Sequence, residues 1–123
     1  MKHFYIVVVL IVFLGCYDVE RNCADYKTGT FRSQIFINDS LFTSDFTRDD
    51  YVQVELYNNK VDSSEVRWIN DCEVIFKTIN PKNRIEKKDI HLKILTTTDS
   101  SYTFEYSYVG ENIKQKGTAI KLN

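Results

Sequence analysis

The sequence predicts an all-β fold: an antiparallel meander of about eight strands that closes into a small up-and-down barrel or a strongly coiled sheet, with a β-sandwich as the alternative. Three observations predict it. From residue 27 onwards, apolar and polar residues alternate with a period of two, the spacing of a half-buried strand. The polar segments between these runs are short, so neighbouring strands have to be antiparallel. No segment after Cys16 shows the period of an amphipathic helix.

Each expected strand is bounded by a turn signal. The strands are expected over residues 30–38, 41–47, 51–57, 72–79, 89–95, 101–109 and 113–122, with a weak strand that follows the turn at 58–60 and ends in residues 65–70. Asn and Asp residues at 38–40, 48–50 and 58–60 separate the first four, because their side chains favour turns. The break at 80–83 contains the only proline of the chain, which has no N–H to donate in a central ladder.

The segment 51–57 has the cleanest alternation. Val52, Val54 and Leu56 point to one side, and Gln53 and Glu55 point to the other. Because one face of each strand is apolar, the sheet has to curl around that face to bury it. We therefore expect the valine and leucine side chains to face the core.

Aromatic side chains dominate the expected inward face. An eight-stranded barrel is either filled by its side chains or holds one small ligand. The bulk of the expected inward residues favours a filled core over a ligand cavity; these are Phe42, Phe46, Trp68, Phe76, Phe104 and several tyrosines. The candidates for contact with a ligand or partner are Trp68, Tyr102, Tyr106 and Tyr108.

The N-terminus has the layout of a secretory signal that ends at a lipidated cysteine. Lys2 precedes an uninterrupted apolar run from Phe4 to Leu14, and Gly15 and Cys16 follow. The run is too short to span a bilayer, which takes about 20 residues. We expect residues 1–15 to be removed and Cys16 to carry the lipid. The alternative is an uncleaved anchor with an unmodified Cys16.

Two further segments complete the predicted organisation. Residues 16–26 are polar and lack periodicity, so we expect a lipidated tether, and residues 27–123 form a single all-β domain. Export through this signal predicts an outer-membrane lipoprotein. Acidic residues just after the lipidated cysteine can direct a lipoprotein to the cell surface, and Asp18 and Glu20 match this signal only weakly. The expected location is therefore either the periplasmic or the surface face of the outer membrane.

The cysteine count agrees with lipidation. The chain has three cysteines, and if Cys16 carries the lipid, Cys23 and Cys72 remain as an even pair. Export permits a disulfide between them, which would close a loop of about 50 residues. The alternative is two separate buried thiols.

No catalytic or metal-binding constellation stands out. His91 lies between Asp89 and Lys93 on a polar face, where we expect it to meet solvent. Carboxylate pairs at Asp49-Asp50 and at Asp71 with Glu73 are read as surface charge. We therefore expect no enzyme activity, no metal site and no cofactor.

The charge pattern gives no case for nucleic-acid binding. Lys2 is the only charged residue before Cys16, so processing leaves 15 basic against 17 acidic residues. Basic residues gather in one loop, at Lys82, Arg84, Lys87 and Lys88, where a solvated loop is the first interpretation and anionic lipid contact the second. The expected partners are the membrane, through the lipid on Cys16, and an envelope protein.

Several strings in the chain resemble those of a known family. KTGTFR at 27–32, RWINDCE at 67–73, NPKN at 80–83 and TDSSYTFEYSYVG at 98–110 are similar to a family of small, uncharacterised lipoproteins from Bacteroidota. The resemblance covers nearly the whole mature chain. It implies an envelope lipoprotein and no established activity.

Members of this family often bear the automatic label "DNA topoisomerase IV". A type II topoisomerase needs a nucleotide-binding domain, a metal-binding acidic cluster and a DNA-cleaving tyrosine in a basic groove. A short, slightly acidic chain without a glycine-rich phosphate loop has room for none of them. We therefore expect a non-catalytic binding or scaffolding module, with a calycin-like barrel for a small apolar ligand as the alternative.

Overall fold

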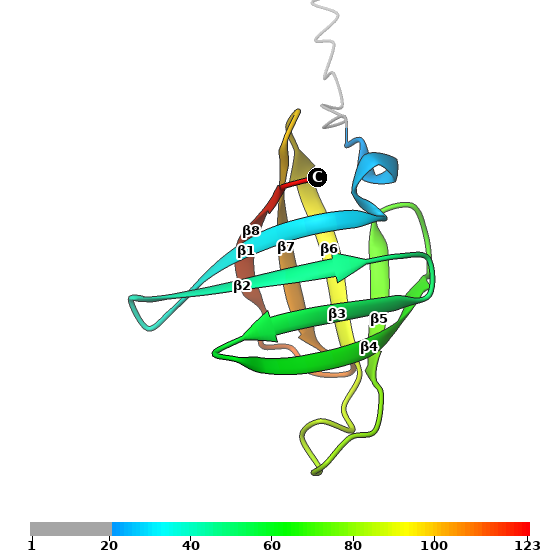
Figure 1. The fold of residues 1–123 in the computed structure, drawn as a ribbon, viewed down its shortest axis with the longest axis vertical. Coiled ribbons are helices and arrows are strands. Elements are labelled where there is room, and N and C mark those ends of the chain that lie inside the picture. The colour runs from blue at the N-terminus through cyan, green and yellow to red at the C-terminus, as the bar shows by residue number, and fades with distance from the viewer. Residues whose placement is uncertain (1–20) are drawn as a thin grey trace, which may run out of the picture.

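The computed structural model describes residues 21–123 and shows an all-β barrel (Figure 1). The elements are the 3₁₀-helix η1 (Cys23–Tyr26) and the strands β1 (Gly29–Ile37), β2 (Ser40–Arg48), β3 (Val52–Tyr57), β4 (Lys60–Trp68), β5 (Glu73–Thr78), β6 (Ile90–Thr97), β7 (Ser101–Tyr108) and β8 (Gln115–Lys121). The expected signal segment 1–15 and Cys16 lie outside the described residues.

The barrel is a simple meander. Each strand pairs antiparallel with the next one, and β8 pairs back to β1 over Phe31–Ile35, so the sheet is closed. The prediction of an eight-stranded up-and-down barrel is confirmed, and the sandwich alternative falls away. In Figure 1 the strands β1–β4 cross in front of β5–β8, while η1 and the C-terminus lie at the upper end of the molecule.

Two hairpins owe their register to asparagine. The β1–β2 turn places Asn38 and Asp39 at φ of 50° and 64°, and the β3–β4 turn places Asn58 and Asn59 at 48° and 60°. Positive φ at both central residues is the requirement of a type I′ turn, and Asn and Asp tolerate it better than other side chains. The turn signals in the sequence therefore fix these two strand pairings.

The core lies against the inner faces of β1 and β5–β8. Its fully buried members include Phe31, Val74, Ile94 and Tyr102. Gly117 permits this packing, because a Cβ on it would lie 2.7 Å from Cζ of Phe104. A larger residue at 117 would displace that ring.

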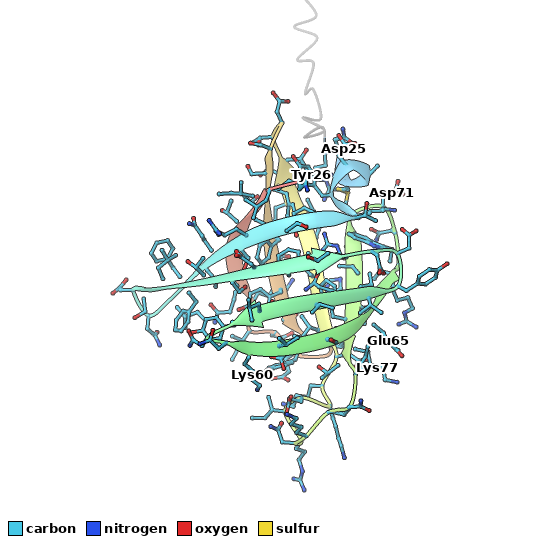
Figure 2. The ribbon with its side chains drawn as sticks, viewed as in Figure 1. Asp25, Tyr26, Lys60, Glu65, Asp71 and Lys77 are labelled. Carbon is cyan, nitrogen blue, oxygen red and sulfur yellow. A yellow bond between two sulfur atoms is a disulfide. The ribbon has the colours of Figure 1, made fainter. Side chains whose placement is uncertain are left out.

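The helix η1 packs on one end of the barrel. Cys23 forms a disulfide with Cys72, as predicted, and both Cys23 and Tyr26 are buried. The Tyr26 hydroxyl donates to the backbone oxygen of Thr98 at 2.5 Å, and its ring meets Tyr102 edge-on at 5.2 Å between centroids. Figure 2 shows Tyr26 at this end. The segment expected to be a tether therefore finishes in a packed helical turn.

The strand β3 faces the opposite way from the expectation. Glu55 pairs with Phe46, whose side chain is 6% exposed, so Glu55 and Gln53 face the interior. Val54 and Leu56 are 40% and 49% exposed on the outside. The expectation that the apolar face of this strand is buried is wrong, because the register of β2 and β3 decides the face.

Phe42 is also more exposed than expected, at 38%. The strand β2 pairs with β3 only over Asp45–Arg48, so residues 40–44 have a partner strand on one side alone. The end of the β1–β2 hairpin projects from the barrel (Figure 1). Phe42 lies on this projection, against Tyr57, with 6.3 Å between ring centroids.

Across residues 21–123, no helix combines the length and apolar character that a membrane crossing requires.

Candidate functional site

The barrel encloses a cavity of about 190 Å³ that is partly open to solvent. Its lining divides into two sets. The apolar residues are Ile35, Phe46, Phe76, Ile90, Leu92 and Phe104, and the polar residues are Ser33, Arg48, Gln53, Glu55, Tyr102 and Tyr106. The core is therefore not completely filled, and the inward face of β3 contributes polar groups to the space that remains.

Arg48, at the end of β2, lies at the side of the cavity nearest η1. Its side chain is almost fully buried, with 2% exposed. Nε donates to the Lys27 oxygen at 3.0 Å, and Nη2 donates to the Tyr26 oxygen. The guanidinium thereby ties the segment after η1 to the barrel wall.

Two side chains take further donors of Arg48. Nη1 donates to Oε1 of Gln53 at 3.0 Å, and Nη2 lies 3.4 Å from the Tyr102 hydroxyl. The guanidinium carbon is also 5.1 Å from the centre of the Phe31 ring and 5.4 Å from those of Phe46 and Trp68. No carboxylate among the described residues forms an ion pair with it. Carbonyl groups and aromatic faces stabilise this buried cation.

Glu55, unlike Arg48, has no hydrogen-bond partner among the side chains of residues 21–123. It faces the cavity from β3, across from Asp62 on β4. Burial raises the pKa of the Glu55 carboxyl, and the nearby charge of Asp62 raises it further. Within residues 21–123, no side chain donates a hydrogen bond to Glu55 or forms an ion pair with it. The carboxylate therefore lines the cavity without a partner from residues 21–123, and its oxygens are accessible to solvent.

Tyr106 lies close to this carboxylate. Burial raises the pKa of the Tyr106 hydroxyl, and the charge of Glu55 raises it further. Two hollows adjoin the cavity and share Ile90 with it. One, of about 170 Å³, includes Glu55, Asp62 and Glu86; the other, of about 320 Å³, includes Tyr106 and Tyr108. The open side of the cavity thus lies towards the loop between β5 and β6.

The structure separates the aromatic candidates taken from the sequence. Tyr102 and Tyr106 line the cavity, and Tyr108 lines the adjoining hollow. Trp68 does not line the cavity. It lies near η1, where Nζ of Lys27 is 5.1 Å from its ring and the Arg48 guanidinium covers it.

The other polar candidates lie on the outer surface. His91 Nε2 is 2.9 Å from Oε1 of Glu73, and Asp49 accepts the backbone N–H groups of Tyr51 and Val52 at 2.8 Å in a turn. Lys88 of the basic loop pairs with Glu111 at 3.2 Å. In the described part of the chain, no three His, Cys, Asp or Glu side chains are grouped to hold a metal ion.

Sequence reasoning missed the polar lining of the cavity. Arg48 had a usable signal: it shares its parity with Phe46 along β2, so it belongs to the inward face rather than to a turn. Glu55 and Gln53 had no such signal, because the alternation of their strand predicted the opposite face to be buried.

Comparisons with known proteins found no relative of this chain. No protein-family model matches the chain, and neither curated proteins nor solved structures gave a match.

Proposed function

We propose that the chain is a lipid-anchored cell-envelope module that binds a small molecule inside its barrel, without catalysis. The observation that carries the proposal is the partly open cavity of about 190 Å³, with an apolar lining and a few polar groups. Binding sites for small molecules are concave and mostly apolar, with a few polar groups that orient the ligand. This supports ligand binding over pure scaffolding.

The size of the cavity limits the ligand. An apolar protein cavity of about 150 Å³ accepts benzene. A space of about 190 Å³ therefore suits a single substituted ring or a short aliphatic chain. The adjoining hollows, which share Ile90 with the cavity, give room for a further substituent towards the solvent.

The disulfide and the N-terminal sequence both support a location in the cell envelope. A Cys23–Cys72 disulfide is typical of proteins in an exported, oxidising compartment. The signal-like N-terminus, Cys16 and the resemblance to small Bacteroidota lipoproteins support anchoring in the outer membrane. Residues 17–22 would join the lipid to η1.

Calorimetric titration with benzyl alcohol tests the proposal on the full chain in detergent. Leu92→Phe adds a ring inside the cavity, and Leu56→Phe adds the same ring on the outer face of β3 as the matched control. We expect binding by the wild type and Leu56→Phe, and none by Leu92→Phe. Partition into micelles is common to all three proteins. Equal heats from all three would overturn the proposal.

A further inference from the structure

The two charged side chains that line the cavity, Arg48 and Glu55, differ in their hydrogen-bond partners. Most donors of Arg48 are taken by the Tyr26 and Lys27 carbonyls, Gln53 and Tyr102. A guanidinium whose donors are engaged has little left to offer an anionic ligand. Glu55 lines the same cavity with no donor from residues 21–123. The charged group of the cavity that a ligand can reach is therefore a solvent-accessible carboxylate, which suits a positive charge or a hydrogen-bond donor.

The position of Glu55 suits a ligand that enters from solvent. It lines both the main cavity and the adjoining hollow that includes Asp62 and Glu86. Asp62 has a partner of its own, since its Oδ1 lies 4.0 Å from Nζ of Lys60, and both side chains are exposed. Figure 2 shows Lys60 at the turn between β3 and β4. Glu55, which has no partner among residues 21–123, is thus the carboxylate that lines the apolar cavity.

The walls around Glu55 favour an organic cation over a neutral molecule. The rings of Phe46, Phe76, Phe104 and Tyr106 line the cavity. Aromatic faces attract cations, most strongly where water is excluded. A ligand with an apolar body and an ammonium head would fill the space and supply the missing partner.

Glu55 is partly buried in the cavity wall, where its oxygens meet solvent and no partner from residues 21–123. The strand β3 turns Gln53 and Glu55 inwards and leaves Val54 and Leu56 exposed. Gln53 is used by Arg48, whereas no described side chain uses Glu55. Departures from the hydrophobic pattern concentrate at functional sites. We propose that the barrel selects a small organic amine, whose ammonium group binds the Glu55 carboxylate; this rests on the proposed function.

Three probes of one shape test the charge preference on the full chain in detergent. Benzylamine is a cation at neutral pH, benzyl alcohol is neutral and benzoate is an anion. We expect benzylamine to bind at least about tenfold more tightly than benzyl alcohol, because a hydrogen bond to a charged group is worth that much. Glu55→Gln keeps the shape and removes the charge. We expect it to abolish this difference.

The outcomes separate this inference from the proposed function. If benzyl alcohol binds and benzylamine binds no better, the amine preference is wrong and the ligand cavity stands. Benzoate as the tightest probe would also overturn the preference and point to Arg48. If no probe binds, both proposals fail. Glu65→Gln, which alters an exposed carboxylate of β4, is the matched control and should retain the full difference.

Acidification gives a second readout. The charged or titratable groups around Glu55 are Arg48 on β2, Asp62 on β4, Tyr106 on β7 and Glu86 in the loop after β5. As the pH falls through the raised pKa of Glu55, the carboxylate takes up a proton and the benzylamine advantage should disappear. In Asp62→Asn the advantage should persist to lower pH, because removing that negative charge lowers the pKa of Glu55. An advantage that does not change down to pH 4 in the wild type would contradict the assignment to Glu55.

Discussion

Arg48 connects three parts of the molecule through one side chain. Its guanidinium holds the Tyr26 and Lys27 carbonyls, fixes Gln53 on β3 and covers the Trp68 ring. Removal of the side chain would leave buried carbonyl oxygens without a donor, and each unsatisfied buried group is costly. Arg48 therefore contributes to stability through hydrogen bonds to neutral groups and through aromatic contacts rather than through an ion pair.

Arg48→Met is expected to lower the free energy of unfolding by about 3 kcal/mol. Arg32→Met is the matched control: Arg32 pairs with Asp45 at 2.9 Å on the surface, where both side chains are solvated, so we expect no measurable loss. Urea unfolding of the three proteins makes the comparison. Similar unfolding midpoints for the two variants would contradict the role given to Arg48.

Glu55 is expected to oppose folding at neutral pH. Because burial and Asp62 raise its pKa, the folded protein holds the proton of Glu55 more tightly than the unfolded chain does. The contribution of this group to stability is therefore most favourable at acidic pH. It is lost as the pH rises from the ordinary carboxyl range through the raised pKa.

Glu55→Gln should consequently be more stable than the wild type at pH 8, by a few degrees in Tm, and equal to it near pH 4. Carboxylates with a lowered pKa, such as Asp45 and Glu73, affect both proteins equally and cancel in the difference. Thermal unfolding of both proteins across this range provides the test. A wild type more stable than the variant at pH 8 would show that Glu55 has a stabilising partner.

At the scale of elements, strand existence was predictable and strand orientation was not. Alternation located the strands, and the Asn-containing turns fixed two hairpins. The face of β3 depends on its register with β2, which places Glu55 opposite Phe46. A one-residue change of register inverts every side chain, so alternation shows that the strand has an apolar and a polar face but not which of them the register turns inwards. Gly117 gave no signal either, because its role depends on contact with Phe104.

The disulfide cross-links η1 to the segment that leads into β5. Cys23 and Cys72 are 49 residues apart, and closure of such a loop is worth about 4 kcal/mol in the chain-entropy account. We expect the double variant Cys23→Ser/Cys72→Ser to lose about that much stability. Reduction should lower the Tm of the wild type and leave that of the variant unchanged. A wild type insensitive to reduction would mean that the bond contributes nothing to the stability of the barrel.

At the scale of the whole molecule, the closed barrel followed from simple constraints. Short connections require antiparallel neighbours, and a one-sided apolar sheet has to close on itself. The cavity did not follow from them. A count of aromatic residues predicts bulk, but the unfilled space depends on how Phe46, Phe76 and Phe104 pack around Glu55 and Gln53. That packing is a property of the tertiary structure alone.

The interior of the barrel is proposed to be a binding site, and an NMR titration of the isotope-labelled full chain with benzyl alcohol tests this most directly. We predict chemical-shift changes at the cavity wall, led by Phe46, Leu92 and Tyr106, with the exposed Leu56 and Val61 unaffected. Changes confined to those outer residues, or none at saturating probe, would contradict it.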